Sequence, residues 1–358
     1  MKVIQVIPTF ELAGAERMCE TLIDGLKRQQ IDVVAVSLFS RKTVITDRLE
    51  QNDIPVLYLD KKSGLDLSMI GKLKKIFKKE KPDIVHAHLA VIKYVGPATL
   101  FSKIKVIHTI HNVADKECGA QDRFVNRLFY KMKKVFPVSL SEKIRLSVEA
   151  VYKIPLEKIP VVYNGVDLSE CMEKQSYELG DTIKILHIGR FEAQKNHIGL
   201  LEAFQLFQKK YPNSLLRLIG EGDLRDEIER YVKENGLSEK VCLLGKQANV
   251  HPYLTDADMF ILPSYYEGVP MTIIEAMGTG LPIVATNVGG IPDLLSDGKT
   301  AILTSLDVKE IAGALERYAE SAELRRNYGQ AALAASARFD ATQMTREYLR
   351  IYNANLNK

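Results

Sequence analysis

PSYYEGVPMTIIEAMGT, residues 263–279, places Glu267 and Glu275 eight positions apart. An apolar run predicts a short strand before this stretch, and Pro270 suits the first turn of a helix within it. In an open α/β sheet such a helix begins at the carboxyl ends of the strands, where its free N–H groups favour a phosphate. Gly268 lets the backbone approach a ligand closely. Because carboxylates accept hydrogen bonds from hydroxyls, the stretch indicates a nucleotide-sugar site, although acidic pairs at this spacing are also typical of solvated helix faces.

Short apolar runs alternate with amphipathic helical stretches along the whole chain. This alternation predicts parallel sheets built from βαβ units, and therefore an α/β fold. The polar stretch 167–181 interrupts the alternation and is a candidate linker, so we place the boundary between two domains, 1–166 and 167–340, at its start. The predicted strands cover residues 3–7, 33–38, 84–87, 106–109, 135–138, 161–162, 183–188, 215–219, 241–244, 259–262 and 282–285.

Length and composition fit a cytoplasmic globular protein. The 358 residues suit two domains of about 150 to 200 residues each. No apolar run approaches the roughly 20 residues of a membrane span, and the N-terminus is predicted to be a strand rather than a secretory signal. The four cysteines are widely scattered and form no C-x-x-C pair. This favours a reducing compartment over a disulfide framework or a zinc site.

The charge is distributed unevenly between the two predicted domains. Residues 1–165 contain 28 Lys/Arg against 18 Asp/Glu, whereas the remainder contains 21 against 27. The excess lies in the lysine run 72–81 and around Lys131, Lys133 and Lys134. The run is typical of an ordinary surface helix, and it also fits a face that rests on anionic lipid. No nucleic-acid-binding motif accompanies the charge.

A second stretch, Gly189-Arg190-Phe191-Glu192-Ala193-Gln194-Lys195-Asn196, follows the predicted strand 183–188. Arg190 supplies a planar multi-donor fork and Lys195 a point charge, and two cations at the carboxyl end of a strand can neutralise a diphosphate. Each of them alone is also typical of an exposed surface position.

Three further elements lie in the first predicted domain. The loop Pro8–Arg17, with Gly14, separates the first strand from the first helix and can present backbone N–H groups to a phosphate. His108-Thr109-Ile110-His111-Asn112 follows another strand, and Asn164-Gly165-Val166-Asp167 contains a turn dipeptide at the expected domain boundary.

Together these elements resemble the retaining glycosyltransferases of family 4, also known as glycosyl transferases group 1. The resemblance rests on Glu267 and Glu275, followed by the Gly289-Gly290 turn, and on Arg190 with Lys195. It extends from Val3 to about Tyr352. Ala13 departs from the family loop, which has a glycine there, and Asn112 stands where an aspartate is common.

The resemblance implies the GT-B fold: two Rossmann-like, doubly wound domains facing a central cleft. The first domain binds the acceptor and regains a C-terminal crossover helix at about 341–358, and the second binds the nucleotide-sugar donor. Arg190 and Lys195 hold the diphosphate, Glu267 the sugar and Glu275 the ribose, while His111 contacts the transferred sugar by hydrogen bonding. The implied donor-binding residues are Gly14, Arg190, Lys195, Glu267, Gly268, Val269, Pro270, Met271, Thr272 and Glu275.

The implied activity is retaining, metal-independent transfer from a nucleotide-sugar, most simply a UDP-sugar, to a glycan or lipid-linked acceptor. Bacterial envelope polysaccharide synthesis fits this activity, with peripheral contact to the inner face of the cell membrane. No cofactor is required. Two alternatives stay open: a nucleotide-sugar epimerase on the same fold and a non-catalytic nucleotide-sugar-binding module.

Three motifs mimic metal or dinucleotide sites. Asp256-Ala257-Asp258 spells the D-x-D of metal-dependent glycosyltransferases of the other major fold, but here it precedes the predicted strand 259–262. Gly220-Glu221-Gly222 lacks the third glycine of a dinucleotide loop. His86 and His88 share one face of a strand without a third ligand nearby, so we interpret them, with His108, as structural.

Overall fold

The computed structural model describes residues 1–357 and divides into two compact units. Unit 1 comprises Met1–Gly165 and Ala341–Lys358, and unit 2 comprises Val166–Asp340. The division after Gly165 lies one residue from the boundary expected from the sequence. The C-terminal segment rejoins unit 1, as the family resemblance implies.

Unit 1 is a six-stranded, wholly parallel sheet with the strand order β3-β2-β1-β4-β5-β6. The strands are β1 (Lys2–Ile7), β2 (Asp32–Ser37), β3 (Val56–Tyr58), β4 (Ile84–His88), β5 (Lys105–Ile110) and β6 (Val135–Ser139). The helices are α1 (Gly14–Arg28), α2 (Val44–Gln51), α3 (Ser68–Glu80), α4 (Ile92–Thr99), α5 (Ala114–Glu117), α6 (Ala120–Lys131), α7 (Glu142–Tyr152) and α15 (Ala341–Leu356). Apart from the edge strand β3, most strand residues are buried, as expected for strands covered on both faces by helices.

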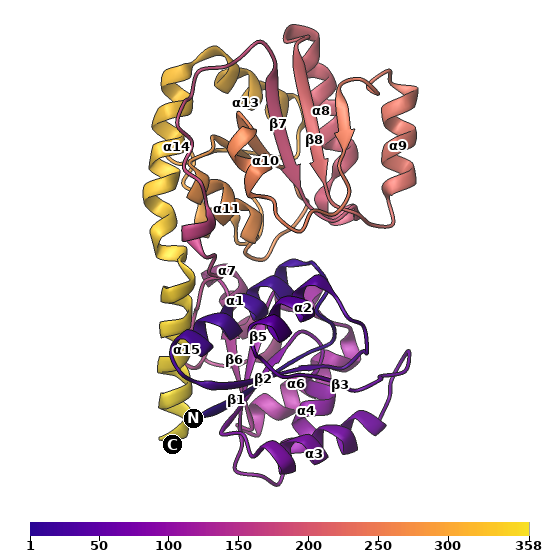
Figure 1. The fold of residues 1–358 in the computed structure, drawn as a ribbon, viewed down its shortest axis with the longest axis vertical. Coiled ribbons are helices and arrows are strands. Elements are labelled where there is room, and N and C mark those ends of the chain that lie inside the picture. The colour runs from indigo at the N-terminus through magenta and orange to yellow at the C-terminus, as the bar shows by residue number, and fades with distance from the viewer. Residues whose placement is uncertain (358) are drawn as a thin grey trace. The chain divides into compact units, whose positions relative to one another are not determined.

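Unit 2 repeats this topology, with six parallel strands in the order β12-β11-β10-β7-β8-β9. Its strands are β7 (Ile183–Ile188), β8 (Ser214–Ile219), β9 (Val241–Leu243), β10 (Met259–Leu262), β11 (Ile283–Thr286) and β12 (Ile302–Thr304). Its helices are α8 (His197–Lys210), α9 (Arg225–Glu234), α10 (His251–Asp256), α11 (Met271–Thr279), α12 (Ile291–Leu294), α13 (Val308–Glu320) and α14 (Ala322–Ser336). Figure 1 shows β7 and β8 side by side with α8 next to β8, and α9 at the outer edge of the unit.

Each sheet has one point at which the strand order reverses direction. It lies between β1 and β4 in unit 1, and between β7 and β10 in unit 2. Open α/β sheets bind ligands outside the carboxyl ends of the strands at such a switch point. The loops after β1, β4 and β5, and those after β7 and β10, are therefore the places to examine for function.

Helix α15 begins at the residue that the family resemblance implies and ends at Leu356, and it packs on unit 1. Its buried face includes Met344, Tyr348 and Tyr352, and it contacts α1 and β5. Figure 1 shows α15 running beside α1. Gly25 of α1 permits this contact, because a Cβ there would lie 2.0 Å from Thr345 Oγ1.

Three details differ from the sequence prediction. The short edge strands β3 and β12 were not expected, and both have only three residues. The strand predicted at 161–162 is wrong, since Val161 makes only an isolated bridge to Ser139. Pro160 and the Asn164-Gly165 turn leave too little chain for a paired strand there.

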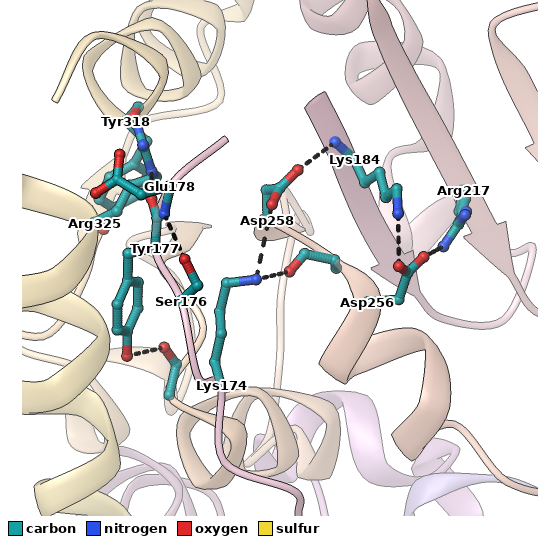
Figure 2. Close-up of polar contacts among 12 residues, drawn as sticks. Lys174, Ser176, Tyr177, Glu178, Lys184, Arg217, Asp256, Asp258, Tyr318 and Arg325 are labelled. Carbon is teal, nitrogen blue, oxygen red and sulfur yellow. Dashed lines mark hydrogen bonds and ion pairs between the residues drawn. The ribbon is translucent and has the colours of Figure 1, made fainter. Parts of the chain in front are cut away.

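The polar stretch after Asp167 is bound to unit 2 rather than being a free tether (Figure 2). Lys174 Nζ donates to the Ala257 carbonyl at 2.7 Å, and Tyr177 OH donates to the Gly280 carbonyl at 2.9 Å. Arg325 Nε donates in turn to the Tyr177 carbonyl at 2.8 Å. These partners are backbone carbonyls, which a composition pattern does not reveal.

Candidate active site

Two loops meet at the switch point of unit 2, one after β7 and one after β10. Asn196 joins them: its Nδ2 donates to the Pro263 carbonyl at 3.1 Å, while its Oδ1 accepts from Gly199 N at 3.2 Å and caps α8. Asn196 has φ +54°, a left-handed conformation that asparagine tolerates better than most residues. A second link runs from Tyr265 N to the Gln194 carbonyl at 2.9 Å.

The closest charged contact at this switch point is an ion pair between the two loops. Lys195 Nζ lies 2.6 Å from Glu267 Oε1, and the two side chains are only 15% and 5% exposed. Ser264 Oγ donates to the same oxygen at 2.6 Å, and Gln194 Nε2 donates to Oε2 at 3.3 Å. Glu267 is thus a nearly buried carboxylate held by three donors, which offsets the cost of burying its charge.

The backbone beside Glu267 is closely packed. Gly289, at φ +55°, could not carry a side chain, since a Cβ would lie 1.8 Å from the Glu267 carbonyl oxygen. Gly290 N donates to the Gly268 carbonyl at 3.0 Å. The Gly289-Gly290 turn therefore packs directly against the backbone of the Glu267 loop and holds it in place.

The predicted donor-binding residues of the stretch 263–279 lie in sequence along this loop and the following helix. Helix α11 begins at Met271, with Pro270 at its N-cap and no side-chain cap. Gly268, Val269, Pro270 and Met271 are buried and Thr272 is half-buried. Glu275 is the fifth residue of α11, and its side chain is fully buried.

Arg190 stands apart from this cluster. Its guanidinium pairs with Glu192 at 2.9 Å, and its side chain is 53% exposed. The structure thus brings Lys195 and Glu267 together but leaves Arg190 at the surface of the same loop. Gly220 and Gly222 pack under this loop, because a Cβ at either would lie within 2.4 Å of the Gly189 or Phe191 carbonyl oxygen. Close packing, not a dinucleotide, accounts for these two glycines.

The two carboxylates of the D-x-D sequence already have cationic partners (Figure 2). Asp256 pairs with Lys184 at 2.6 Å and also with Arg217. Asp258 accepts from Lys184 N at 2.9 Å and lies 3.7 Å from Lys174 Nζ. Among residues 1–357, no group of three or more His, Cys, Asp or Glu side chains has the arrangement of a metal site.

The switch point of unit 1 is lined by histidines. His111 follows β5, and its Nε2 lies 3.1 Å from His88 Nδ1. Burial, and to a lesser degree the neighbouring His108, lowers the pKa of His111 to about 3, so the ring is neutral at physiological pH. This fits a hydrogen-bonding group better than a base.

The backbone at His111 is held by a carboxylate that the sequence analysis did not identify. Glu117 Oε1 accepts from His111 N at 3.1 Å, and Oε2 accepts from Asn112 N at 2.8 Å. Burial raises the pKa of Glu117 to about 7, and these two hydrogen bonds oppose the shift. Gln194 and Ser264 were missed in the same way, since no pattern separates a polar loop residue that supports a carboxylate from one that faces water.

Gly14 is the first residue of α1, after Ala13 in an extended conformation with φ −135°. The departure from the family glycine at position 13 therefore causes no strain, because this position does not need positive φ. Gly14 is exposed, and no atom lies within 4 Å of where its Cβ would be.

The fold identifies the structural class of the protein. The solved structure of Anabaena HepE in complex with UDP-glucose matches this chain with a TM-score of 0.86 at 19% identity, covering 99% of this chain and 100% of that one. The architecture is thus the GT-B fold of glycosyltransferases.

Sequence comparison then gives the family. Residues 12–170 match Glycosyltransferase Family 4 and residues 171–334 match Glycosyl transferases group 1. The chain belongs to this family and is a glycosyltransferase.

Two relatives are similar over most of both chains. One is the Escherichia coli UDP-Gal:alpha-D-GlcNAc-diphosphoundecaprenol alpha-1,3-galactosyltransferase, 27% identical over 88% of this chain and 86% of the relative. The other is the Bacillus anthracis N-acetyl-alpha-D-glucosaminyl L-malate synthase, 27% identical over 80% of this chain and 78% of the relative.

Proposed function

We propose that this chain is a retaining glycosyltransferase that takes its sugar from a UDP-sugar and needs no divalent metal. The observation that carries the proposal is the Lys195–Glu267 pair, 2.6 Å apart, at the switch point of unit 2 and next to the N-terminus of α11. The names of the Escherichia coli relative and of the HepE complex both include a UDP-sugar, which supports this donor.

The proposed chemistry is electrostatic. As the bond to the anomeric carbon breaks, negative charge grows on the leaving diphosphate. Lys195 and the N–H groups at the start of α11 meet that charge with donors already in place, and Arg190 would turn from Glu192 to join them. Such a cationic cluster can replace a metal ion. The D-x-D carboxylates already have cationic partners, since Asp256 pairs with Lys184 and Arg217, and Asp258 lies 3.7 Å from Lys174 Nζ.

The remaining residues are assigned to substrate hydroxyls and to the phosphate. Glu267 and the backbone of Gly268–Thr272 hold the sugar, and Glu275 holds the ribose. The backbone at Gly14 approaches the phosphate, and His111 hydrogen-bonds the transferred sugar. We assign no enzyme nucleophile, and the leaving phosphate would assist deprotonation of the acceptor on the same face.

We propose that unit 2 binds the donor and unit 1 the acceptor. For the acceptor we propose a lipid-linked glycan. The Escherichia coli relative acts, by its name, on a diphosphoundecaprenol-linked sugar. No helix among residues 1–357 is both long and apolar enough to span a bilayer. Because such an acceptor is membrane-bound, we propose peripheral contact of this chain with the inner face of the cell membrane.

The surface of unit 1 best suited to that contact is α6 rather than the lysine-rich α3. On α3 the apolar residues Met69, Leu73 and Phe77 are buried, so mainly lysines face water. On α6 and the turn after it, Phe124, Leu128 and Met132 are 72%, 48% and 45% exposed at helical spacing. Lys131, Lys133 and Lys134 are exposed beside this apolar row, the combination that an anionic interface favours.

Flotation with phosphatidylglycerol-containing liposomes tests this surface. The double variant Phe124→Ser/Leu128→Ser should lose lipid association, whereas the matched control Lys74→Gln/Lys75→Gln on α3 should keep most of it. Equal losses in both variants would remove the assignment to α6, and no association of the unaltered chain at low salt would end the membrane proposal.

A donor screen read by UDP release tests the activity itself. We expect release to depend on an added lipid-linked acceptor and to persist in EDTA, and the anomeric configuration of the product to match that of the donor. Conversion of the donor to an isomeric UDP-sugar without acceptor would support the epimerase instead. Tight UDP binding without turnover on any acceptor would support a binding module.

A further inference from the structure

His111 is the last member of a hydrogen-bonded row that begins on the C-terminal helix. Tyr352 of α15 accepts from Gln5 Nε2 at 3.4 Å, and Gln5 presents its Oε1 to His88 Nε2 at 2.8 Å. His88 Nδ1 then faces His111 Nε2 at 3.1 Å. Gln5, His88 and Tyr352 are fully buried, so water does not compete for these contacts.

Both histidines of this row are neutral. Burial is the largest cause that lowers the pKa of His88 well below its ordinary value, and His86 and His111 add to it. A neutral imidazole has one N–H donor and one bare acceptor nitrogen, so each contact in the row fixes the next.

The direction of the row follows from Gln5. A carbonyl oxygen only accepts, so His88 Nε2 must carry the proton and donate to Gln5 Oε1. His88 Nδ1 is then the bare nitrogen and accepts, which requires that His111 Nε2 donates. We infer that Gln5 and His88 are positioning residues that hold His111 as the Nε2-protonated tautomer, with a bare Nδ1 that accepts a hydrogen bond from a substrate hydroxyl.

This inference deepens the proposed function and rests on it for the identity of the substrate. Within residues 1–357, Nδ1 of His111 makes no hydrogen bond. Glu117 fixes the backbone of His111 and Asn112, and His88 holds the His111 ring at Nε2. The ligand group is a hydroxyl that donates, and a substrate position bearing only an acceptor, such as a ring oxygen, is disfavoured.

The tautomer is measurable without any substrate. Long-range proton–nitrogen NMR correlation on the full chain with ¹⁵N-labelled histidine distinguishes a protonated from a bare ring nitrogen, and the His111→Gln variant identifies the His111 signals among the seven histidines. We expect a protonated Nε2 and a bare Nδ1 at neutral pH. The opposite tautomer, which follows if the Gln5 amide is turned so that its NH₂ faces His88, would overturn the inference, as would a mixture of both.

Two substitutions at His88 separate positioning from simple packing. The amide of His88→Asn lies near the position of Nδ1, so its oxygen can still accept from His111 Nε2. The amide of His88→Gln lies near the position of Nε2, so it can still donate to Gln5 but no longer accepts from His111. We expect His88→Asn to keep the tautomer and stay within about threefold of the unaltered kcat/KM, and His88→Gln to lose about tenfold or more, the worth of one lost hydrogen bond. Equal losses in the two variants would indicate packing alone and contradict the inference.

His108→Gln serves as the matched control. His108 is buried next to the same strands, but it bonds Tyr130 OH at 2.6 Å and the Leu89 carbonyl at 2.9 Å instead of His111. This variant should leave the His111 tautomer unchanged.

The outcomes also separate this inference from the proposed function. If the NMR shows the expected tautomer but His111→Gln transfers sugar normally, the row exists and the role of His111 in transfer fails. If the tautomer is wrong while UDP release still depends on Lys195, the glycosyltransferase proposal stands and the positioning role is lost.

Discussion

The two units share one strand order, yet their switch points are built from opposite chemistry. In unit 2 a lysine and a carboxylate lie 2.6 Å apart, and a surface arginine lies on the same loop. In unit 1 the corresponding place holds buried histidines that are neutral and bonded to one another and to tyrosines. The same fold therefore supports a site for charge in one unit and a site for directional hydrogen bonds in the other.

The difference fits a division of labour in sugar transfer. A diphosphate needs cations that are permanently charged, and lysine and arginine meet that need. A sugar hydroxyl needs a donor or acceptor of fixed direction, which a neutral imidazole offers.

Removing the positive charge of Lys195 in unit 2 should have the largest effect on turnover. Lys195→Ala is expected to lower kcat about 10²- to 10³-fold, because it removes a preorganised cation that meets charge in the transition state. Steady-state UDP release measures this. The matched control is Lys184→Ala, which removes another lysine of unit 2, one that pairs with the 44% exposed Asp256. Comparable losses in both variants would show a general effect of charge on folding instead of a role for Lys195.

The same variant should also reduce stability. Without Lys195, the nearly buried Glu267 retains only Ser264 and Gln194 as donors, and leaving a buried charge without its partner costs about 3 kcal/mol or more. Glu267→Gln in the Lys195→Ala background should recover part of that loss. Urea denaturation followed by circular dichroism measures it, since the chain has no tryptophan.

Acid should weaken unit 1 more than unit 2. Burial lowers the pKa of His108 to about 4 and that of His111 to about 3, and it lowers the pKa values of His86 and His88 well below the ordinary range. In unit 2 it lowers the pKa of His187 to about 4 and that of His197 to about 2.

The sign follows from the direction of these shifts. Their folded pKa values lie below the unfolded value of about 6.5, so the unfolded chain binds protons first. The stabilisation is complete above pH 6.5 and is lost as the pH falls toward the folded values, by up to about 1.4 kcal/mol per pH unit for each histidine. Glu117 acts oppositely: with its pKa raised to about 7, its contribution is lost as the pH rises from about 4.5 to 7.

Urea midpoints between pH 7 and pH 5 measure this dependence. In His108→Gln the free energy of unfolding should depend less steeply on pH, by about one proton fewer taken up on unfolding, whereas Lys184→Ala should leave this slope unchanged. Stability that rises on acidification through this range would contradict the neutral state of the histidines.

The smallest effect concerns the N-terminus of α1. Gly14→Ala should fold normally, because the space around its Cβ position is open, but it should raise KM for the donor about tenfold if the phosphate approaches this backbone closely. Gly71→Ala on α3 is the control, since its Cβ position is equally open. An unchanged KM in Gly14→Ala would remove Gly14 from the donor site.

The fold was largely predictable because its strands are buried on both faces. Such strands appear in the sequence as continuous apolar runs, and β7 and β10 begin and end where the apolar runs predict. The strands β3 and β12 were not predicted, because a strand of three residues at a sheet edge is too short to show a pattern of apolar residues.

The candidate site was predictable only in part. Arg190, Lys195 and Glu267 were found through motif spacing and family resemblance, which concern side chains near in sequence. The supporting groups, such as Glu117 beneath His111, or Gln5 and Tyr352 behind His88, come from distant positions. Their contacts exist only after folding, and no local pattern indicates them.

Calorimetric titration with UDP and with uridine tests the central claim most directly. We propose that unit 2 binds the donor chiefly through the diphosphate, which Lys195 contacts. The unaltered chain should then bind UDP far more tightly than uridine, and Lys195→Ala should weaken UDP binding about tenfold or more while leaving uridine binding unchanged. Equal affinities for the two ligands, or undiminished UDP binding by Lys195→Ala, would contradict it.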